Sequence, residues 1–302
     1  MNLIEKLESV EIKADNRIPE KDRRFCEAQQ TAYDAAREDL KRLDELWSEV
    51  SSNQWNILEE VADCSYDKER YIQIHGLSRS HILDTLEKSH THFISCIVHY
   101  FNHAYRVSIS EEEIQEHLLP VEPSRYNHGD ESWKQYHEKL RTLNLRYEAV
   151  VDQVFVQLGG RTFDERAFSE LQKKCHKGAW SSYYKTAQYP LKNDTVQLSS
   201  GCRYENWFGR DRWESNDSLK DILRGVAHFE TDSYDHYPQD FSELLGWGRI
   251  ECPLYEYSTC DKLRHIKLFK NGRVDIKFTS KANANQFVTE YLGRVFKRRD
   301  FS

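Results

Sequence analysis

The sequence predicts an α+β protein, with a mostly helical N-terminal half and a small mixed α+β C-terminal half that contains an antiparallel β-hairpin. Three observations lead to this prediction. Apolar residues recur at three- and four-residue steps through most of the first half, as on one face of a helix. That period ends near Trp180, after which aromatic residues and turn formers become frequent. Apolar and polar residues then alternate on both sides of Asn271-Gly272, which is typical of a hairpin.

Two long helices joined by a turn are expected first. The apolar residues of 21–50 lie on one stripe of a helix. The polar run 51–53 then offers an N-cap, so a second helix is expected to begin behind it and to form an αα-hairpin with the first. A further long helix is expected over 80–106, because its apolar residues again share one face.

Capping signals mark the next helices. A hydroxyl residue three positions before a glutamate can form a capping box, and we expect one at Ser110 with Glu113 and one at Thr162 with Glu165. Pro120 is expected to end the first of these helices. Another long helix is expected over 133–158, where Gly159-Gly160 stops it.

The loop 120–130 contains proline and glycine and is the strongest internal boundary. We therefore expect a helical domain over 1–125 and a mixed α+β domain over 126–302. In the second domain we expect a short helix over 218–229, and strands over 265–269 and 274–278 that a tight type I′ turn at Asn271-Gly272 connects. A closing helix is expected over 282–292, followed by a basic tail.

The charge distribution is asymmetric. The chain has a net charge of -7 and a pI near 6.0, which disfavours attraction of its whole surface to nucleic acid or to anionic membrane. From residue 261 to the end there are 11 Lys and Arg against 4 Asp and Glu, a balance of +7 that leaves -14 on the preceding residues. The C-terminal part is therefore a basic module on an acidic body.

Several protein classes lack sequence support. No stretch is long and apolar enough to span a membrane, and no N-terminal signal sequence is visible, so we expect a cytoplasmic protein without membrane contact. The seven cysteines are scattered and are expected to be reduced core thiols. The glycine-rich motifs for phosphate, dinucleotide and serine-hydrolase chemistry are absent, so no cofactor is expected.

Three segments resemble a known protein family: 180–186, 219–228 and 266–278. The first reads W-S-S-Y-Y-K-T, and the third contains a strand, an F-K-N-G turn and a second strand that ends in Phe278. These segments resemble a bacterial family of unknown function, DUF forty-nine forty-two, over about residues 147–291. Members of that family lie on plasmids and phages, near or fused to adenine DNA methyltransferases.

This chain departs from the family pattern at two positions. Ala187 stands where the family usually has Asn, and Asp275 stands where its second strand often has His. The resemblance implies a mobile genetic element or phage-defence setting with a nucleic-acid theme. It implies no particular reaction, and methyltransferase chemistry would have to come from a partner.

Arg70 and His75 have the R-x4-H spacing of helical HEPN ribonucleases. In such enzymes the imidazole acts as a general base or acid and the guanidinium stabilises the charged transition state. A surface or inter-helix pair would give the same spacing, so two interpretations stay open: a metal-independent ribonuclease, and a structural role for both residues.

Four histidines within the helix expected over 80–106 fall on nearly one side of it: His81, His92, His99 and His103. His99 and His103 are spaced to share a divalent metal ion, but no acidic residue between them supplies metalloprotease chemistry. Packing, a pH-sensitive partner surface and a weak metal site all remain open, and no metal is expected.

Basic residues of the hairpin and tail, together with the amide of Asn271 at the turn, are candidates for phosphate contact: Lys267, Lys270, Asn271, Arg273, Lys277, Arg294, Lys297 and Arg298. A solvated sheet face that balances the acidic body is the alternative. The aromatic residues between Trp180 and Trp213 could stack unpaired bases, although packing in a core is by far the commoner role of such residues.

Together these patterns favour an accessory protein of a bacterial mobile-element or phage-defence locus. It is expected to bind nucleic acid or a nucleic-acid-modifying protein through its basic C-terminal module. The ribonuclease with Arg70 and His75 is one alternative. A protein-only interaction module, in which the acidic N-terminal half mimics nucleic acid, is the other. The sequence leaves the oligomeric state open.

Overall fold

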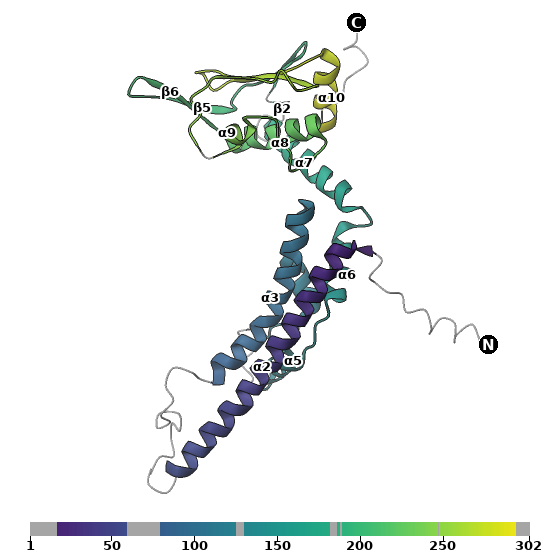
Figure 1. The fold of residues 1–302 in the computed structure, drawn as a ribbon, viewed down its shortest axis with the longest axis vertical. Helices are drawn as coiled ribbons and strands as arrows, with labels where there is room; N and C mark the ends of the chain where they lie inside the picture. The colour runs from purple at the N-terminus through teal and green to yellow at the C-terminus, as the bar shows by residue number, and fades with distance from the viewer. Residues whose placement is uncertain are drawn as a thin grey trace, which may run out of the picture. The chain divides into compact units, whose positions relative to one another are not determined.

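The computed structural model describes residues 17–58, 79–124, 130–181, 186–187, 189–246 and 248–293. The chain divides into two compact units, Met1–Arg161 and Thr162–Ser302. The division lies later in the chain than the boundary expected at 125/126, because the helix before Gly159 packs with the N-terminal helices. The first unit is helical and the second holds an antiparallel sheet, which confirms the predicted α+β class (Figure 1).

The described part of the first unit contains helices α2 (Glu20–Leu58), α3 (Arg79–Tyr105), α4 (Glu111–Leu118), α5 (Asp130–Thr142) and α6 (Tyr147–Leu158). Helices α2 and α3 lie side by side (Figure 1). The apolar face of α3 forms the centre of this unit, with Ile94, Ile97 and Phe101 fully buried. The helix expected over 80–106 is confirmed.

Helix α2 runs without a break through 51–53, so the predicted turn and N-cap at these residues are wrong. Serine and asparagine in a helix interior cost only about 0.5 kcal/mol each, and a long helix tolerates them. The burial pattern of α2 also differs from its apolar stripe. Its buried residues end at Arg37, while Leu43 and Leu46 further along are exposed.

The helix expected over 133–158 is interrupted between Thr142 and Tyr147, so that prediction is also wrong. The interruption exposes backbone groups that the polar side chains of α2 satisfy. The Gln30 amide donates to the carbonyl of Leu145 at 3.1 Å and accepts the N–H of Tyr147 at 2.8 Å. The Arg37 guanidinium donates to the Asn144 side chain at 3.0 Å. Buried backbone groups need such partners, so these residues permit the break.

A buried histidine on α3 completes this polar network. His90 is fully buried, and its Nε2 lies 2.7 Å from the carbonyl of Leu140, to which it must donate. Nδ1 is therefore unprotonated and accepts the Tyr33 hydroxyl at 2.7 Å. Burial lowers the pKa of His90, which keeps the imidazole neutral. One side chain from α2 and one from α3 thus fix the end of α5.

The two predicted capping boxes differ in the structure. Thr162 and Glu165 form both reciprocal hydrogen bonds at the start of α7 (Phe163–Ala179). Ser110 accepts the N–H of Glu113, but its own N–H donates to the Gln157 side chain at 2.8 Å. The Ser110 box is therefore only half formed, because α6 supplies the second partner.

The second unit contains a five-stranded antiparallel sheet with strand order β3-β4-β9-β8-β7. These strands are β3 (Leu191–Lys192), β4 (Thr195–Leu198), β7 (Leu254–Glu256), β8 (Leu263–Leu268) and β9 (Val274–Phe278). A short pair, β1 (Trp180–Ser181) with β2 (Thr186–Ala187), and a longer two-stranded ribbon, β5 (Cys202–Trp207) with β6 (Arg210–Ser215), lie outside it. The predicted hairpin of β8 and β9 is confirmed.

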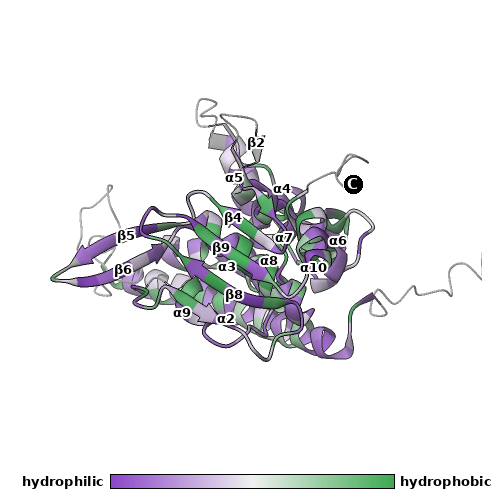
Figure 2. Cartoon of the chain, turned by 90° about the horizontal axis from the view of Figure 1, so that it is seen from above, coloured by the Kyte–Doolittle hydropathy of each residue, from purple (hydrophilic) through white to green (hydrophobic). Residues whose placement is uncertain are grey.

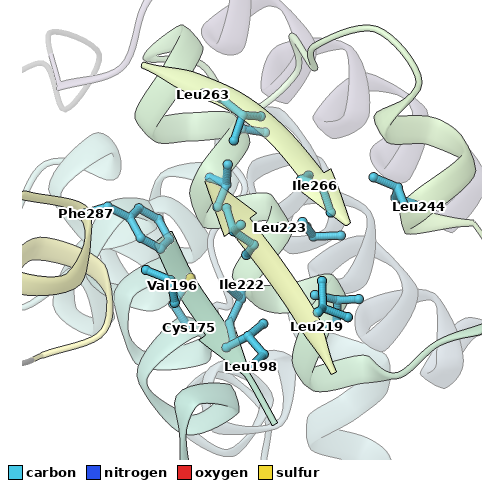
Figure 3. Packing of buried hydrophobic residues seen from close by; sticks show 14 of the residues in the cluster. Cys175, Val196, Leu198, Leu219, Ile222, Leu223, Leu244, Leu263, Ile266 and Phe287 are labelled. Atoms are coloured by element: carbon cyan, nitrogen blue, oxygen red, sulfur yellow. The ribbon is translucent and has the colours of Figure 1, made fainter. Parts of the chain in front are cut away.

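Helices α8 (Asp217–Thr231) and α10 (Lys281–Tyr291) cover one face of this sheet, while α9 (Phe241–Leu245) is a short helix beside them (Figure 1). Figure 3 shows Leu223 of α8 beside Ile266 of β8, and Ile222 of α8 beside Val196 of β4. Helix α7 approaches α8 so closely that a Cβ on Gly225 would lie 2.5 Å from the Cys175 sulfur. Glycine is therefore required at this crossing.

The turn between β8 and β9 is not of type I′. A left-handed conformation occurs at Gly272, with φ 83°, but not at Asn271. The N–H of Gly272 donates to the carbonyl of Phe269, and the N–H of Phe269 donates to that of Arg273. This is the three-residue loop in which a type I turn is followed by a left-handed residue.

In the part of the chain that the structure describes, no helix is long and apolar enough to cross a membrane.

Substitution of Gln30 by Ala is expected to lower the free energy of unfolding by about 2–6 kcal/mol, because two buried backbone groups lose their partner at about 1–3 kcal/mol each. Urea unfolding followed by circular dichroism measures this change. The control is Gln29→Ala, one residue earlier on α2, with an expected change within about 0.5 kcal/mol. Equal losses in the two variants would contradict the role assigned to Gln30.

The stability of the protein is expected to fall as the pH decreases below about 6.5, the value for an unperturbed histidine. The lowered pKa of His90 means that the unfolded chain takes up a proton first, so acidification favours unfolding. In His90→Gln the decrease in the free energy of unfolding between about pH 7 and pH 5, measured by urea unfolding, should be smaller than in the wild type. His103→Gln, at an exposed position on the same helix, should follow the wild-type curve; a superimposable His90→Gln curve would refute the assignment.

Candidate nucleic-acid interface

Among the residues that the structure describes, no helix covers one face of the sheet of the second unit. In β9, Val274, Ile276 and Phe278 are buried, while Asp275 and Lys277 alternate with them and are half-buried. Successive side chains of a strand point to opposite faces, so Asp275 and Lys277 lie on the face away from α8. Cross-strand pairing places Lys267 opposite Asp275 and His265 opposite Lys277 on that face. We call this surface, together with the turn of residues 269–273, the open face.

Three of the predicted basic residues are held by carboxylates. The ammonium of Lys270 lies 2.5 Å from the Asp211 carboxylate, and that of Lys277 lies 3.7 Å from Asp194. Arg273 pairs with Asp275 at 3.0 Å. These three basic residues therefore alternate with acids and do not form an uninterrupted cationic stripe.

The Phe269 ring contacts both Arg273 and Lys267. The Arg273 guanidinium lies 3.9 Å from the centre of the Phe269 ring, and the Lys267 ammonium lies 5.2 Å from it. Such cation–π contacts hold the charged groups in position without neutralising them. Within the described ranges, Lys267 has no carboxylate partner and is exposed.

Asp211 is the most heavily bonded acid of this surface. Its carboxylate accepts the Tyr204 hydroxyl at 2.6 Å and the Asn206 amide at 2.9 Å, in addition to the Lys270 ammonium. Lys270 and these two donors lower the pKa of Asp211 to about 2. Asp211 is therefore ionised at neutral pH and positions Lys270, whose own pKa it raises.

Two further residues of the open face have local roles. The Asn271 side chain accepts the N–H of Arg273 at 3.2 Å, which stabilises the turn. Burial and the neighbouring Lys277 lower the pKa of His265, so this imidazole is neutral at pH 7. Asn271 thus shapes the turn that presents Lys270, and His265 adds no positive charge to the face.

Four of the five histidines of α3 lie on its exposed side, and the fifth is the buried His90. His81, His92, His99 and His103 are all exposed, and the rings of His99 and His103 are 6.5 Å apart. The structure adds Cys96 to this row, with its sulfur 3.5 Å from His92 Nε2. Among the described residues no group of three or more His, Cys, Asp or Glu is arranged to hold a metal ion. These side chains therefore form separate pairs of potential metal ligands, His99 with His103 and His92 with Cys96.

Five predicted site residues lie outside the residues that the structure describes: Arg70, His75, Arg294, Lys297 and Arg298. The ribonuclease interpretation depends on the first two. Both that interpretation and the contribution of the basic tail therefore stay predictions.

Most described aromatic residues between Trp180 and Trp213 belong to the core. Tyr189 and Trp213 are buried, and Tyr204 packs against Trp213 with ring centres 5.4 Å apart. Phe208 differs, with 92% of its surface exposed. Sequence analysis included Phe208 only as one of the aromatics that could stack a base; it missed the exposure of this residue and the pairing of Asp211 with Lys270. The Phe-Gly pair between two alternating runs was the available signal for the first, whereas nothing in the sequence relates the acid to the lysine.

No protein-family model, no curated protein and no solved structure matches this chain.

Proposed function

We propose that the second unit binds the phosphate backbone of nucleic acid through its open face, as an accessory protein of a bacterial mobile-element or phage-defence locus. The observation that carries this proposal is the cluster around Phe269. Two cations, Lys267 and Arg273, lie against one ring, and Lys267 has no acidic partner in the described part of the chain. Positioned cations of this kind contact phosphate without reading base sequence.

The acids of the open face are compatible with phosphate binding. Exposed ion pairs stabilise a folded protein by only about 0–1 kcal/mol, so exchange of a carboxylate for a phosphate costs little. The pairs of Lys270 and Lys277 are of this exposed or half-exposed kind. In the free protein the acids lower the net charge of the face and disfavour indiscriminate binding of polyanions. We therefore expect moderate affinity with a strong dependence on salt.

The biological setting rests on the sequence resemblance to the plasmid and phage family. In that setting the chain would present nucleic acid to a nucleic-acid-modifying enzyme, which supplies the chemistry. The same open face would then be the part that directs the partner to its substrate. An enzyme activity of the chain itself is not part of this proposal.

The proposal is tested by fluorescence anisotropy with labelled single- and double-stranded DNA and RNA at two salt concentrations. The double variant Lys267→Ala, Arg273→Ala should bind more weakly, and its log–log salt slope should be smaller by about 0.9 for each duplex phosphate that the variant no longer neutralises. The control is Lys173→Ala, Lys174→Ala, which removes two exposed lysines of α7. Unchanged binding in the first variant, or equal decreases in both, would overturn the assignment of the open face.

Asp211→Asn provides a test of opposite sign. Removal of the carboxylate charge releases Lys270 for phosphate, while the amide keeps a polar partner for Tyr204 and Asn206. We expect tighter binding, by up to about tenfold, and a salt slope that is larger by about 0.9. Weaker binding in this variant would show that the Asp211 pair positions the lysine for a different purpose.

A further inference from the structure

The β5–β6 ribbon ends in a strained turn. Phe208 and Gly209, between the paired residues Trp207 and Arg210, have φ values of 50° and 80°. Two consecutive left-handed residues define a type I′ turn, which favours Asn-Gly at these positions. A bulky residue such as phenylalanine rarely adopts this conformation. The turn therefore tolerates a residue that its backbone disfavours, and such outliers cluster at functional sites.

Phe208 is also the most exposed of the large hydrophobic residues that the structure describes, at 92%. The ribbon projects past the end of the five-stranded sheet, so its turn lies at an extremity of the second unit (Figures 1 and 2). Neither backbone preference nor burial accounts for an aromatic ring at this position. A role in contact with another molecule accounts for both features.

Hydrogen bonds along one side of the ribbon hold this turn in place. The N–H of Gly209 donates to Asn206 Oδ1 at 3.2 Å, and Asn206 Nδ2 donates to Asp211 at 2.9 Å. Asp211 in turn binds Lys270 of the open face. A continuous chain of hydrogen bonds and an ion pair therefore connects the turn that carries Phe208 with the proposed phosphate-binding surface. Because these bonds already order the turn, binding would have a smaller entropic cost.

One cation of the ribbon, Arg210, lies beside Phe208 without an acidic partner among the described residues. On the strands, arginine and glutamate alternate across the pair, with Arg203 opposite Glu214 and Arg212 opposite Glu205. Arg210 at the turn is exposed and lies opposite Trp207, and it has no acidic partner among the described residues. An aromatic ring next to a free guanidinium is the combination that proteins use to stack a base and bind its phosphate.

We infer that Phe208 stacks on a nucleobase, with Arg210 on an adjacent phosphate, while the open face follows the backbone. This inference deepens the proposed function and rests on it. The base comes either from a single strand or from a duplex that the ring enters as an apolar wedge between base steps. The stacking chemistry is the same in the two cases, and the experiment separates them.

The test substitutes Phe208 by Asn in the full chain. Asparagine suits the type I′ turn, so the variant should unfold at the same urea concentration as the wild type or at a higher one. Its affinity for a single-stranded oligonucleotide should nevertheless fall by about tenfold, the usual range for the loss of one stacked base. Tyr237→Asn, at an exposed aromatic outside the ribbon, should leave affinity unchanged.

A base analogue reports the source of the base. 2-Aminopurine becomes brighter when it leaves a base stack. If Phe208 enters a duplex, the wild-type protein should therefore increase the fluorescence of a duplex that contains the analogue. If Phe208 stacks on single strands instead, the protein should change the fluorescence of a labelled single strand and leave that of the duplex unchanged. Phe208→Asn should abolish either signal. The salt slope should stay at the wild-type value, because stacking releases no counterions.

Three outcomes would overturn the inference. Full affinity in Phe208→Asn, with binding still weakened in Lys267→Ala, Arg273→Ala, would refute the stacking role and leave the proposed function intact. Lower stability in Phe208→Asn, together with the same decrease in affinity, would indicate a structural role. No binding of the wild type to any nucleic acid would refute both proposals and direct the search for a ligand of Phe208 to apolar pockets of protein partners.

Discussion

The fold of the first unit depends on backbone groups that a helix break leaves inside the protein. The polypeptide between Thr142 and Tyr147 leaves the helical path, and its amide groups are buried against α2. Unpaired buried amides would cost about 1–3 kcal/mol each, so the break is possible only where side chains replace the missing hydrogen bonds. Gln30 supplies an acceptor and a donor at once, and His90 supplies a donor for the preceding carbonyl. This explains why the buried face of α2 is polar at positions where an apolar stripe would be expected.

The fold of the second unit depends on the close approach of two helices, α7 and α8. Helix α7 crosses α8 at Gly225, where the Cys175 sulfur occupies the space that a Cβ would need. Close packing at this crossing lets both helices and the sheet share one core, to which Leu219, Leu223 and Ile266 contribute (Figure 3). With one face of the sheet buried in this way, the alternation of each strand leaves its charged residues on the other face. The open face is thus a consequence of how the core is packed.

The electrostatics of the open face would disfavour indiscriminate binding of polyanions in the function that we propose. The basic module has a clear excess of positive charge in the sequence, but folding brings Asp194 and Asp211 next to its lysines. Both acids come from segments before residue 261, that is, from the acidic body. A surface of paired ions binds a polyanion by exchange, which keeps affinity sensitive to salt and to the geometry of the ligand. Such a surface suits an accessory protein that acts with a partner better than a nonspecific coat for nucleic acid.

The sequence by itself determined the elements whose signals are local. The period of α3, the capping box at Thr162, the alternation of β8 and β9, and the class of the fold follow from spacing and propensity within a few turns of chain. The basic residues of the hairpin could also be identified, because charge is a property of each residue.

Tertiary structure decided everything that depends on a distant partner. Nothing near 143–146 in the sequence indicates that Gln30, more than a hundred residues earlier, satisfies this segment and so divides one predicted helix into two. In the same way, the partner of Lys270 and the exposure of Phe208 depend on how the ribbon packs beside the β8–β9 turn. Hydrogen bonds and ion pairs form between groups that are close in space, and the sequence records only their order along the chain.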